Sequence, residues 1–274
     1  MKRLVLSAVA VLSLSALVQP SFLAQKAKAV PSLASATPAV QPDRDAAMRA
    51  YILAHPEVIL ESVRAYDAHQ KQIAADSVRE NVRAHFAELT TGNAPTLVSK
   101  DTSATPVTVV EFFDYRCGFC KKAADTVLQL GSAPGVRVVY KDLPILGKDS
   151  MLAAQAALAA RAQGGYEKLH NAMLASDAQL TPELIDKLAV DSGLDLARLK
   201  TDMKSPAVNA EIANNMDLAQ KLNVEATPTF VVGDQLVSGA ITPEAFQSLI
   251  STARSSKDTM ARVDTNRAAS PVAR

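Results

Sequence analysis

The sequence predicts an α/β protein in which a short parallel sheet carries the functional site. A nearly continuous run of β-branched and aromatic residues over 106–114 is typical of a buried strand. A helical pattern over 120–130 and a second strand pattern at 136–140 follow it, and this order predicts a parallel β-α-β unit. A further strand pair, 229–232 and 236–238, is joined by a Gly-Asp turn and predicts a hairpin.

The N-terminus has the pattern of an export signal. Lys2 and Arg3 precede an apolar stretch over 4–18, which is shorter than the roughly 20 residues of a membrane-spanning helix. Ala27-Lys28-Ala29 offers the small-x-small pattern of a cleavage site, and Ala34-Ser35-Ala36 is a second candidate. We therefore expect a signal peptide over 1–29 and a periplasmic or otherwise exported protein.

Charge and compartment narrow the classes of partner. Removal of residues 1–29 takes away four basic residues, leaving 25 against 28 acidic ones and a net charge of −3. This balance gives no electrostatic reason to expect nucleic acid or an anionic membrane as partner. Exported compartments are oxidising and permit disulfides, which decides how cysteines are interpreted.

Residues 43–95 predict a helical domain after an Ala-, Pro- and Ser-rich linker at 30–42. His55-Pro56 interrupts the helical pattern. Beyond it, five residues recur with the 4-3-4-3 spacing of a coiled-coil seam: Ile59, Val63, Tyr66, Gln70 and Ile73. The seam either packs on the protein's own catalytic domain or binds the same helix of other subunits. We favour the second interpretation, a homo-oligomer through residues 43–90.

The remaining elements fill out the α/β domain. An edge strand is expected within 96–105, helices occupy most of 146–222, and an amphipathic helix spans 243–253. The C-terminal residues 255–274 contain few large apolar side chains, so we expect a disordered tail.

The chemistry centres on the only two cysteines of the chain, Cys117 and Cys120. A zinc site needs about four ligands, and no second cysteine pair exists. A structural disulfide across so short a loop stabilises little. A redox pair at a helix N-terminus fits better, because the helix dipole and free N–H groups favour a thiolate at the first cysteine. A strand, Cys-x-x-Cys and helix in a β-α-β context is typical of a thioredoxin-like site.

Three segments carry a family resemblance. Residues 111–121, Glu-Phe-Phe-Asp-Tyr-Arg-Cys-Gly-Phe-Cys-Lys, resemble the DsbA-like branch of the thioredoxin superfamily. Residues 226–230, Ala-Thr-Pro-Thr-Phe, resemble the cis-proline loop of that superfamily, and 146–222 resembles the helical insertion of DsbA-like proteins. The resemblance implies a DsbA-like thioredoxin domain over 96–254. Residues 51–59 are similar to the N-terminal region of the suppressor-of-copper-sensitivity C group, where such a segment can form a trimeric stalk.

The resemblance implies roles for individual residues. Cys117 is expected to be the exposed attacking thiolate and Cys120 the resolving thiol, with Gly118 and Phe119 tuning the potential. Glu111 stands six residues before Cys117, at the position of a buried acid that assists proton transfer. An edge strand with this carboxylate in water is the alternative.

Three further residues complete the expected site. Lys141 is either the partner of Glu111 or a solvated surface lysine. Thr227 and Pro228 are expected to form the substrate-binding loop, with a cis bond on the strength of the resemblance alone.

The direction of the reaction stays open. Cys-Gly-Phe-Cys and the threonine before the proline are closer to disulfide isomerases than to the oxidases of the DsbA group. The sequence thus predicts an isomerase or reductase acting on protein substrates, with a dithiol oxidase as the alternative. A membrane redox partner and no cofactor beyond the redox disulfide are expected. Copper tolerance is a further hypothesis, because two thiolates suit Cu(I).

Overall fold

The computed structural model describes residues 42–91, 94–98 and 106–269, and these divide into two compact units with a boundary between Glu61 and Ser62. The predicted signal peptide, its cleavage site and residues 30–41 of the linker lie outside the described residues. Three helices form the N-terminal segment, with a break at His55-Pro56 as expected: α1 (Pro42–Ala54), α2 (Glu57–Ala84) and α3 (Phe86–Thr90).

A five-stranded mixed sheet forms the centre of the second unit, in the order β1-β3-β2-β4-β5. Strands β2 and β3 are parallel and are joined by helix α4, which confirms the predicted β-α-β unit. The bounds of these elements are β1 (Thr96–Val98), β2 (Val107–Phe113), α4 (Gly118–Ser132), β3 (Val136–Asp142), β4 (Thr229–Val232) and β5 (Gln235–Ser238). Strands β1 and β5 are the edges, and β4 and β5 form the predicted hairpin.

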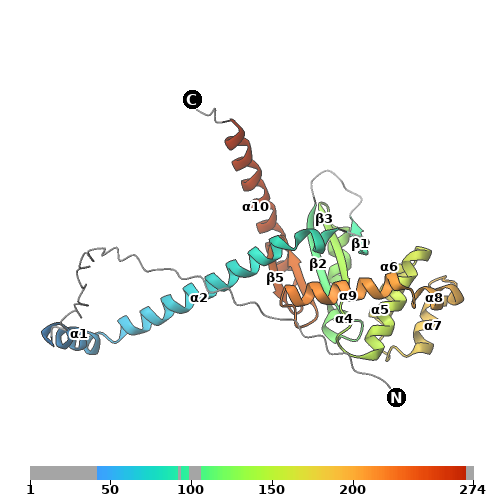
Figure 1. The fold of residues 1–274 in the computed structure, drawn as a ribbon, viewed down its shortest axis with the longest axis horizontal. Helices are drawn as coiled ribbons and strands as arrows, with labels where there is room; N and C mark the ends of the chain where they lie inside the picture. The colour runs from blue at the N-terminus through green and yellow to red at the C-terminus, as the bar shows by residue number, and fades with distance from the viewer. Residues whose placement is uncertain (1–41, 92–93, 99–105, 270–274) are drawn as a thin grey trace, which may run out of the picture. The chain divides into compact units, whose positions relative to one another are not determined.

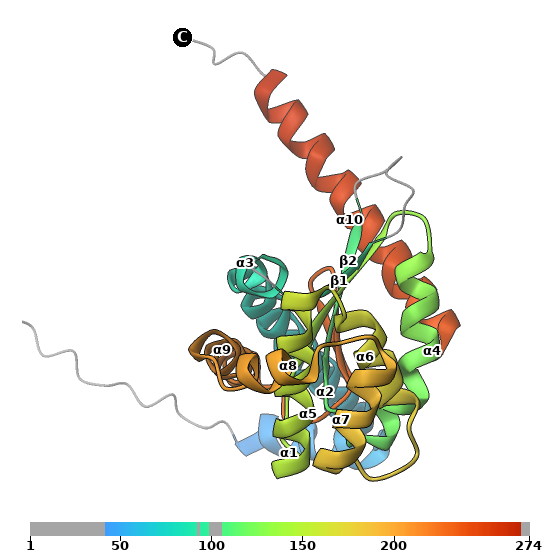
Figure 2. The same ribbon diagram turned by 90° about the vertical axis from the view of Figure 1, so that its right-hand side faces the viewer.

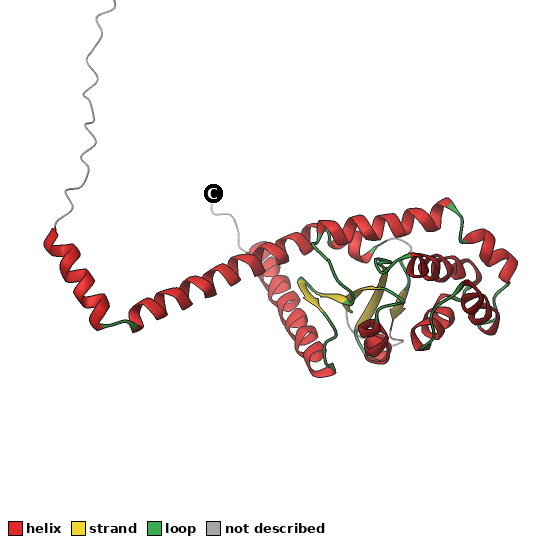
Figure 3. Ribbon diagram, turned by 90° about the horizontal axis from the view of Figure 1, so that it is seen from below, coloured by secondary structure: helices red, strands yellow, loops and turns green. Residues whose placement is uncertain are grey.

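Helices cover both faces of this sheet (Figure 3). Between β3 and β4 the chain forms the expected helical insertion, in which α5 to α8 lie side by side (Figure 2). Its elements are α5 (Lys148–Ala160), the 3-10 turn η1 (Arg161–Gln163), α6 (Tyr166–Ala175), α7 (Pro182–Asp191), α8 (Leu196–Asp202) and α9 (Pro206–Lys221). Pro182 and Pro206 each begin a helix whose preceding Thr or Ser caps it through the side-chain oxygen.

The alternation of side chains along β2 separates two hydrophobic clusters. Val109 and Phe113 pack in the larger cluster with α4 to α8, whereas Val110 and Phe112 pack in the smaller one with α2, α3 and α9. Glu111 lies two residues from both Val109 and Phe113, so its side chain lies on the same face of the sheet as theirs, which α4 covers. This placement determines which polar groups can reach the cysteines.

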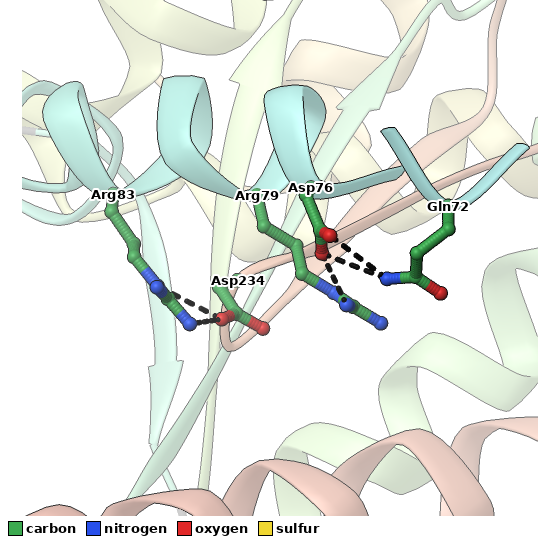
Figure 4. A network of polar contacts seen from close by, with 5 residues as sticks. All are labelled: Gln72, Asp76, Arg79, Arg83 and Asp234. Atoms are coloured by element: carbon green, nitrogen blue, oxygen red, sulfur yellow. Dashed lines mark hydrogen bonds and ion pairs between the residues drawn. The ribbon is translucent and has the colours of Figure 1, made fainter. Parts of the chain in front are cut away.

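The C-terminal end of α2 is attached to the sheet domain. Val82 and Leu89 are fully buried in the smaller cluster. The Asn81 amide donates a hydrogen bond of 2.7 Å to the Lys221 carbonyl. Arg83 pairs with Asp234 in the β4–β5 turn, beside a local network of Gln72, Asp76 and Arg79 (Figure 4). The alternative of packing on the protein's own domain is therefore correct for this end of the helix.

The expected disordered tail is wrong for residues 255–269, which continue helix α10 (Pro243–Ala269; Figure 1). The reason is local: no glycine or proline interrupts 244–269, and Ala, Arg, Lys and Met are good helix formers. A lack of large apolar side chains removes packing partners, but it does not by itself break a helix. Among the described residues, no helix has the length and hydropathy that a membrane span needs.

Candidate active site

The two cysteines lie at the junction of β2 and α4, as predicted. Cys117 is the N-cap residue of α4, with extended backbone angles of φ −75° and ψ 114°. Its carbonyl accepts the hydrogen bond of the Lys121 amide at 3.1 Å. The free N–H groups of the first turn and the positive end of the α4 dipole therefore lie at Cys117.

The two thiols differ in accessibility, although Cys117 is less exposed than expected. Its residue surface is 7% exposed, whereas Cys120 is completely buried. The Cys117 thiol is covered because its Sγ lies 3.1 Å from the Thr227 carbonyl oxygen, to which it donates. Burial raises the pKa of the Cys120 thiol; a hydrogen bond with the Asp114 backbone opposes the shift, and Glu111 and Cys117 add to it. Only Cys117 has any surface with which a substrate can react.

Thr227 and Pro228 lie beside the cysteine pair, as the family resemblance implies. The peptide bond between them is cis. The loop leads directly into β4, which pairs antiparallel with β2. The structure thus places a backbone carbonyl of this loop against the Cys117 sulfur.

Glu111 lies in the central strand β2, between β3 and β4, and only 3% of its surface is exposed. The alternative of a solvated edge strand is therefore wrong. Burial raises the pKa of its carboxyl group from the ordinary 4.5 to about 8. Its charge in turn raises the pKa of Cys120, so the two groups compete for negative charge. A group with this pKa can take up and release a proton near neutral pH.

Lys141 is not the partner of Glu111, which corrects one of the two expectations for it. In the parallel register Glu111 lies opposite Tyr140, and Lys141 lies opposite Phe112. Because side chains alternate along a strand, Lys141 projects to the sheet face away from the cysteines. It is 6% exposed and its ammonium group donates to the Glu88 carbonyl at 3.1 Å, so it is not solvated either. Burial lowers the pKa of Lys141.

Gly118 and Phe119 form the exposed rim of the site. Phe119 is 62% exposed, and the Lys122 ammonium nitrogen lies 5.5 Å from its ring centroid. A Cβ atom added at Gly118 would meet no heavy atom within 4 Å. The surface beside Cys117 is therefore open above the first turn of α4.

Asp114 is a site residue that the sequence interpretation missed. Its buried carboxylate accepts three hydrogen bonds: from the Arg116 amide at 2.7 Å, the Ser150 hydroxyl at 2.7 Å and the Leu146 amide at 3.0 Å. These bonds hold the loop before Cys117 against the start of the helical insertion. The hydrogen bond from the Arg116 amide forms a turn in which an aspartate side chain binds the amide two residues later. Such a turn can be predicted from the sequence.

A buried cluster of aromatic and ionisable side chains lies behind the cysteines and was also missed. The Tyr115 hydroxyl lies 3.0 Å from His170 Nδ1, and Tyr166 donates a 3.4 Å hydrogen bond to Asp142. Burial lowers the pKa of His170 to about 3 and raises that of Asp142 to about 8. The contacts join the segment between β2 and α4, strand β3 and helix α6, and these residues are too far apart in sequence for a local pattern to show them.

Within the described ranges, no group of three or more His, Cys, Asp and Glu side chains could hold a metal ion. A Cu(I) site would therefore rest on Cys117 and Cys120 among these residues. Two soft thiolates are a suitable donor set for Cu(I), and copper binding stays a prediction.

Comparisons with solved structures extend the likeness over most of the chain. A thioredoxin-like oxidoreductase from Silicibacter pomeroyi DSS-3 is 43% identical, with a TM-score of 0.59 over 62% of this chain and 97% of that one. BcfH of Salmonella enterica Typhimurium is 28% identical, with a TM-score of 0.61 over 77% and 95%. ScsC of Proteus mirabilis, at 22% identity and a TM-score of 0.57 over 77% and 95%, shares the fold.

Curated relatives and a family model give the assignment. The Na(+)/H(+) antiporter NhaA 3 of Salinispora tropica is 32% identical over 151 residues, which are 54% of this chain. The chain spans only 23% of that antiporter's length. The model of the DSBA-like thioredoxin domain matches residues 108–251, more than half of the chain and all of the cysteine motif. The chain thus belongs to the family of DSBA-like thioredoxin domains.

Proposed function

We propose that the protein is an exported thiol–disulfide oxidoreductase that acts on disulfides of protein substrates, preferentially as an isomerase or reductase. The observation that carries the proposal is the contact between the Cys117 sulfur, at the N-terminus of α4, and the Thr227 carbonyl. A nucleophilic sulfur beside backbone polar groups is suited to an extended polypeptide that carries a disulfide. The export pattern at the N-terminus supports the compartment.

The reaction balances on the two cysteines and Glu111. The Cys117 thiolate attacks one sulfur of the substrate disulfide, forms a mixed disulfide and releases the other sulfur as a thiolate. Cys120 then gives its proton to Glu111 and attacks the Cys117 sulfur. The substrate leaves as a second thiolate, two electrons have passed to it, and the protein holds the Cys117–Cys120 disulfide. In isomerisation a different substrate thiolate instead attacks the substrate sulfur of the mixed disulfide, forms a new substrate disulfide and displaces Cys117 as a thiolate, with no net transfer of electrons.

Refolding of a scrambled multi-disulfide protein tests the direction. Catalytic amounts of the reduced protein are expected to refold such a substrate and restore its activity, because the Cys117 mixed disulfide permits repeated reshuffling of the substrate's disulfides. A parallel assay gives the oxidised protein a fully reduced substrate. If only this second assay yields native protein, the dithiol oxidase is the correct assignment.

The seam of α2 supports the proposed homo-oligomer. Its apolar residues Ile59, Val63, Tyr66 and Ile73 are 45%, 52%, 63% and 50% exposed in the single chain. Surface of this kind at 3.5-residue spacing is stabilised by the same helix of other subunits. An oligomer can shield Cys117 from enzymes that would oxidise it, which fits an isomerase.

Two acidic substitutions in the seam test the assembly. Val63→Glu with Tyr66→Glu is expected to weaken association by at least about a hundredfold, because carboxylates would be buried against apolar partners. Sedimentation of the exported form should change from a dimer or trimer to a single chain. Ala68→Glu, on the opposite side of the same helix, is the matched control and should leave the mass unchanged. Equal masses for the parent and both variants would rule out this seam.

A further inference from the structure

A cleft of about 600 Å³ begins at the cysteine motif and runs between α4 and α6. Gly118 lines its near end, and it continues past Lys122, Asp125 and Leu128 on successive turns of α4. Leu174 and Asp177 contribute to the opposite wall, from α6 and the segment after it. None of its lining residues comes from the Thr227-Pro228 loop, so it is a separate surface, and it approaches the site at Gly118, the residue that follows Cys117.

The length of the cleft fits a short stretch of extended peptide. Gly118 and Leu128 are ten residues apart on one helix, which corresponds to about 15 Å of helix axis. An extended chain advances about 3.3 Å per residue, so about four or five residues span this distance. A peptide linked to Cys117 can therefore lie along α4 from its cysteine outward.

Two lysines and two aspartates line the cleft. Lys121 and Lys122 stand on the first turns of α4, Asp125 and Asp177 lie farther along, and Leu128 and Leu174 add apolar surface. The Lys121 ammonium donates to the Ser176 carbonyl, which leaves Lys122 as the lysine without a partner carbonyl or carboxylate among the described residues. Within the described residues, neither Asp125 nor Asp177 takes part in an ion pair. Their charges are therefore available to a ligand.

We infer that this cleft binds the substrate segment flanking the reacting cysteine and selects its charge pattern. The inference rests on the proposed function. The ligand class is an extended peptide with an acidic residue one or two positions from the cysteine, a basic residue at about the third, and an apolar residue beyond. The acidic residue meets Lys122 and the basic residue meets Asp125 and Asp177.

Paired peptides test the inference. Each carries one cysteine as a mixed disulfide with a chromophoric thiol, whose release reports attack by the reduced protein. In each pair, one peptide has an acidic residue next to the cysteine and a lysine at the third position, and the other peptide has these two residues exchanged. In one pair the flanking residues precede the cysteine, and in the second pair they follow it. The acid-first peptide of at least one pair is expected to react about three- to tenfold faster, with less preference in high salt.

Charge exchange within the cleft gives the decisive comparison. Lys122→Asp with Asp125→Lys keeps the net charge and is expected to reverse the preference. The matched control, Lys187→Asp with Asp191→Lys, makes the same exchange on exposed positions of α7 and should keep it. Should the α4 variant be recovered unfolded, Asp177→Lys, outside any helix, is expected to reduce the preference at least about twofold.

The outcomes separate this inference from the proposed function. Equal rates for the exchanged peptides in both pairs, or a preference that the cleft variants leave unchanged, would overturn the cleft as a specificity site. Failure of every peptide and of the free chromophoric disulfide to react would overturn the proposed function itself.

Discussion

Replacing Cys117 with alanine is expected to lower the rate of thiol–disulfide exchange about a thousandfold or more, to the level of the uncatalysed reaction. Cys117 is the only cysteine with exposed surface, and it is the N-cap residue of α4. Cys120 cannot substitute for it, because burial raises the pKa of its thiol and leaves it protonated. The loss is measured as the rate at which the reduced variant reduces a peptide disulfide, and the release of a chromophoric thiol monitors that rate.

Cys120→Ala is the informative counterpart. Attack by Cys117 needs no second thiol, so the first step should proceed and the mixed disulfide should accumulate, because nothing resolves it. Mass spectrometry under non-reducing conditions detects the adduct and identifies its sulfur. An adduct on Cys120 in the Cys117→Ala variant would reverse the assignment of nucleophile and resolving thiol.

The parts of the fold that the sequence predicted are those specified locally. The strand at 107–113 and the cysteine motif at the start of α4 follow from a run of strand-forming residues and a change of periodicity. The family resemblance placed Glu111 inside, whereas its strand pattern alone left a solvated edge strand open. Local reasoning failed for residues 255–269, where composition was taken as disorder although nothing in it breaks a helix.

The errors and omissions at the site depend on register and on distant contacts. Lys141 could be assigned to a sheet face only after the pairing of Glu111 with Tyr140 was known, since a shift of one residue moves every side chain to the other face. The contact of Tyr115 with His170 joins positions 55 residues apart. No periodicity in the sequence predicts such a long-range contact. The cleft along α4 is likewise formed only when α6 packs against it.

Glu111→Gln is expected to make the reduced protein more stable at alkaline pH, by about 3 to 5 kcal/mol at pH 8. The carboxyl pKa is raised from 4.5 in the unfolded chain to about 8 in the folded one. Between these values folding takes up a proton, so this group's contribution to stability is complete below pH 4.5 and falls as the pH rises towards 8. Glutamine resembles the neutral form and removes this decline.

Urea unfolding of the reduced protein from pH 5 to 9 measures the effect. The difference between the variant and the parent should grow across this range, from less than about 1 kcal/mol at the acid end. Burial also raises the pKa of Asp142 to about 8, so the stability of the parent falls for a second reason over the same pH range. Asp142→Asn is therefore measured alone and in combination with Glu111→Gln. Glu80→Gln, an exposed carboxylate of α2, is the matched control. A parallel pH profile for Glu111→Gln and the parent would show that Glu111 is ionised in the folded protein.

The same substitution is expected to slow resolution of the mixed disulfide by about a hundredfold near neutral pH, because glutamine cannot accept the Cys120 proton. In the parent this step should accelerate as the pH rises towards 8, while the folded state loses stability over the same interval. Stopped-flow release of a peptide thiol from the Cys117 adduct follows the step directly. Gained stability together with lost turnover in one variant would identify Glu111 as a residue kept for proton transfer at the expense of the fold. Gained stability with an unchanged resolution rate would limit it to a buried acid without a part in the chemistry.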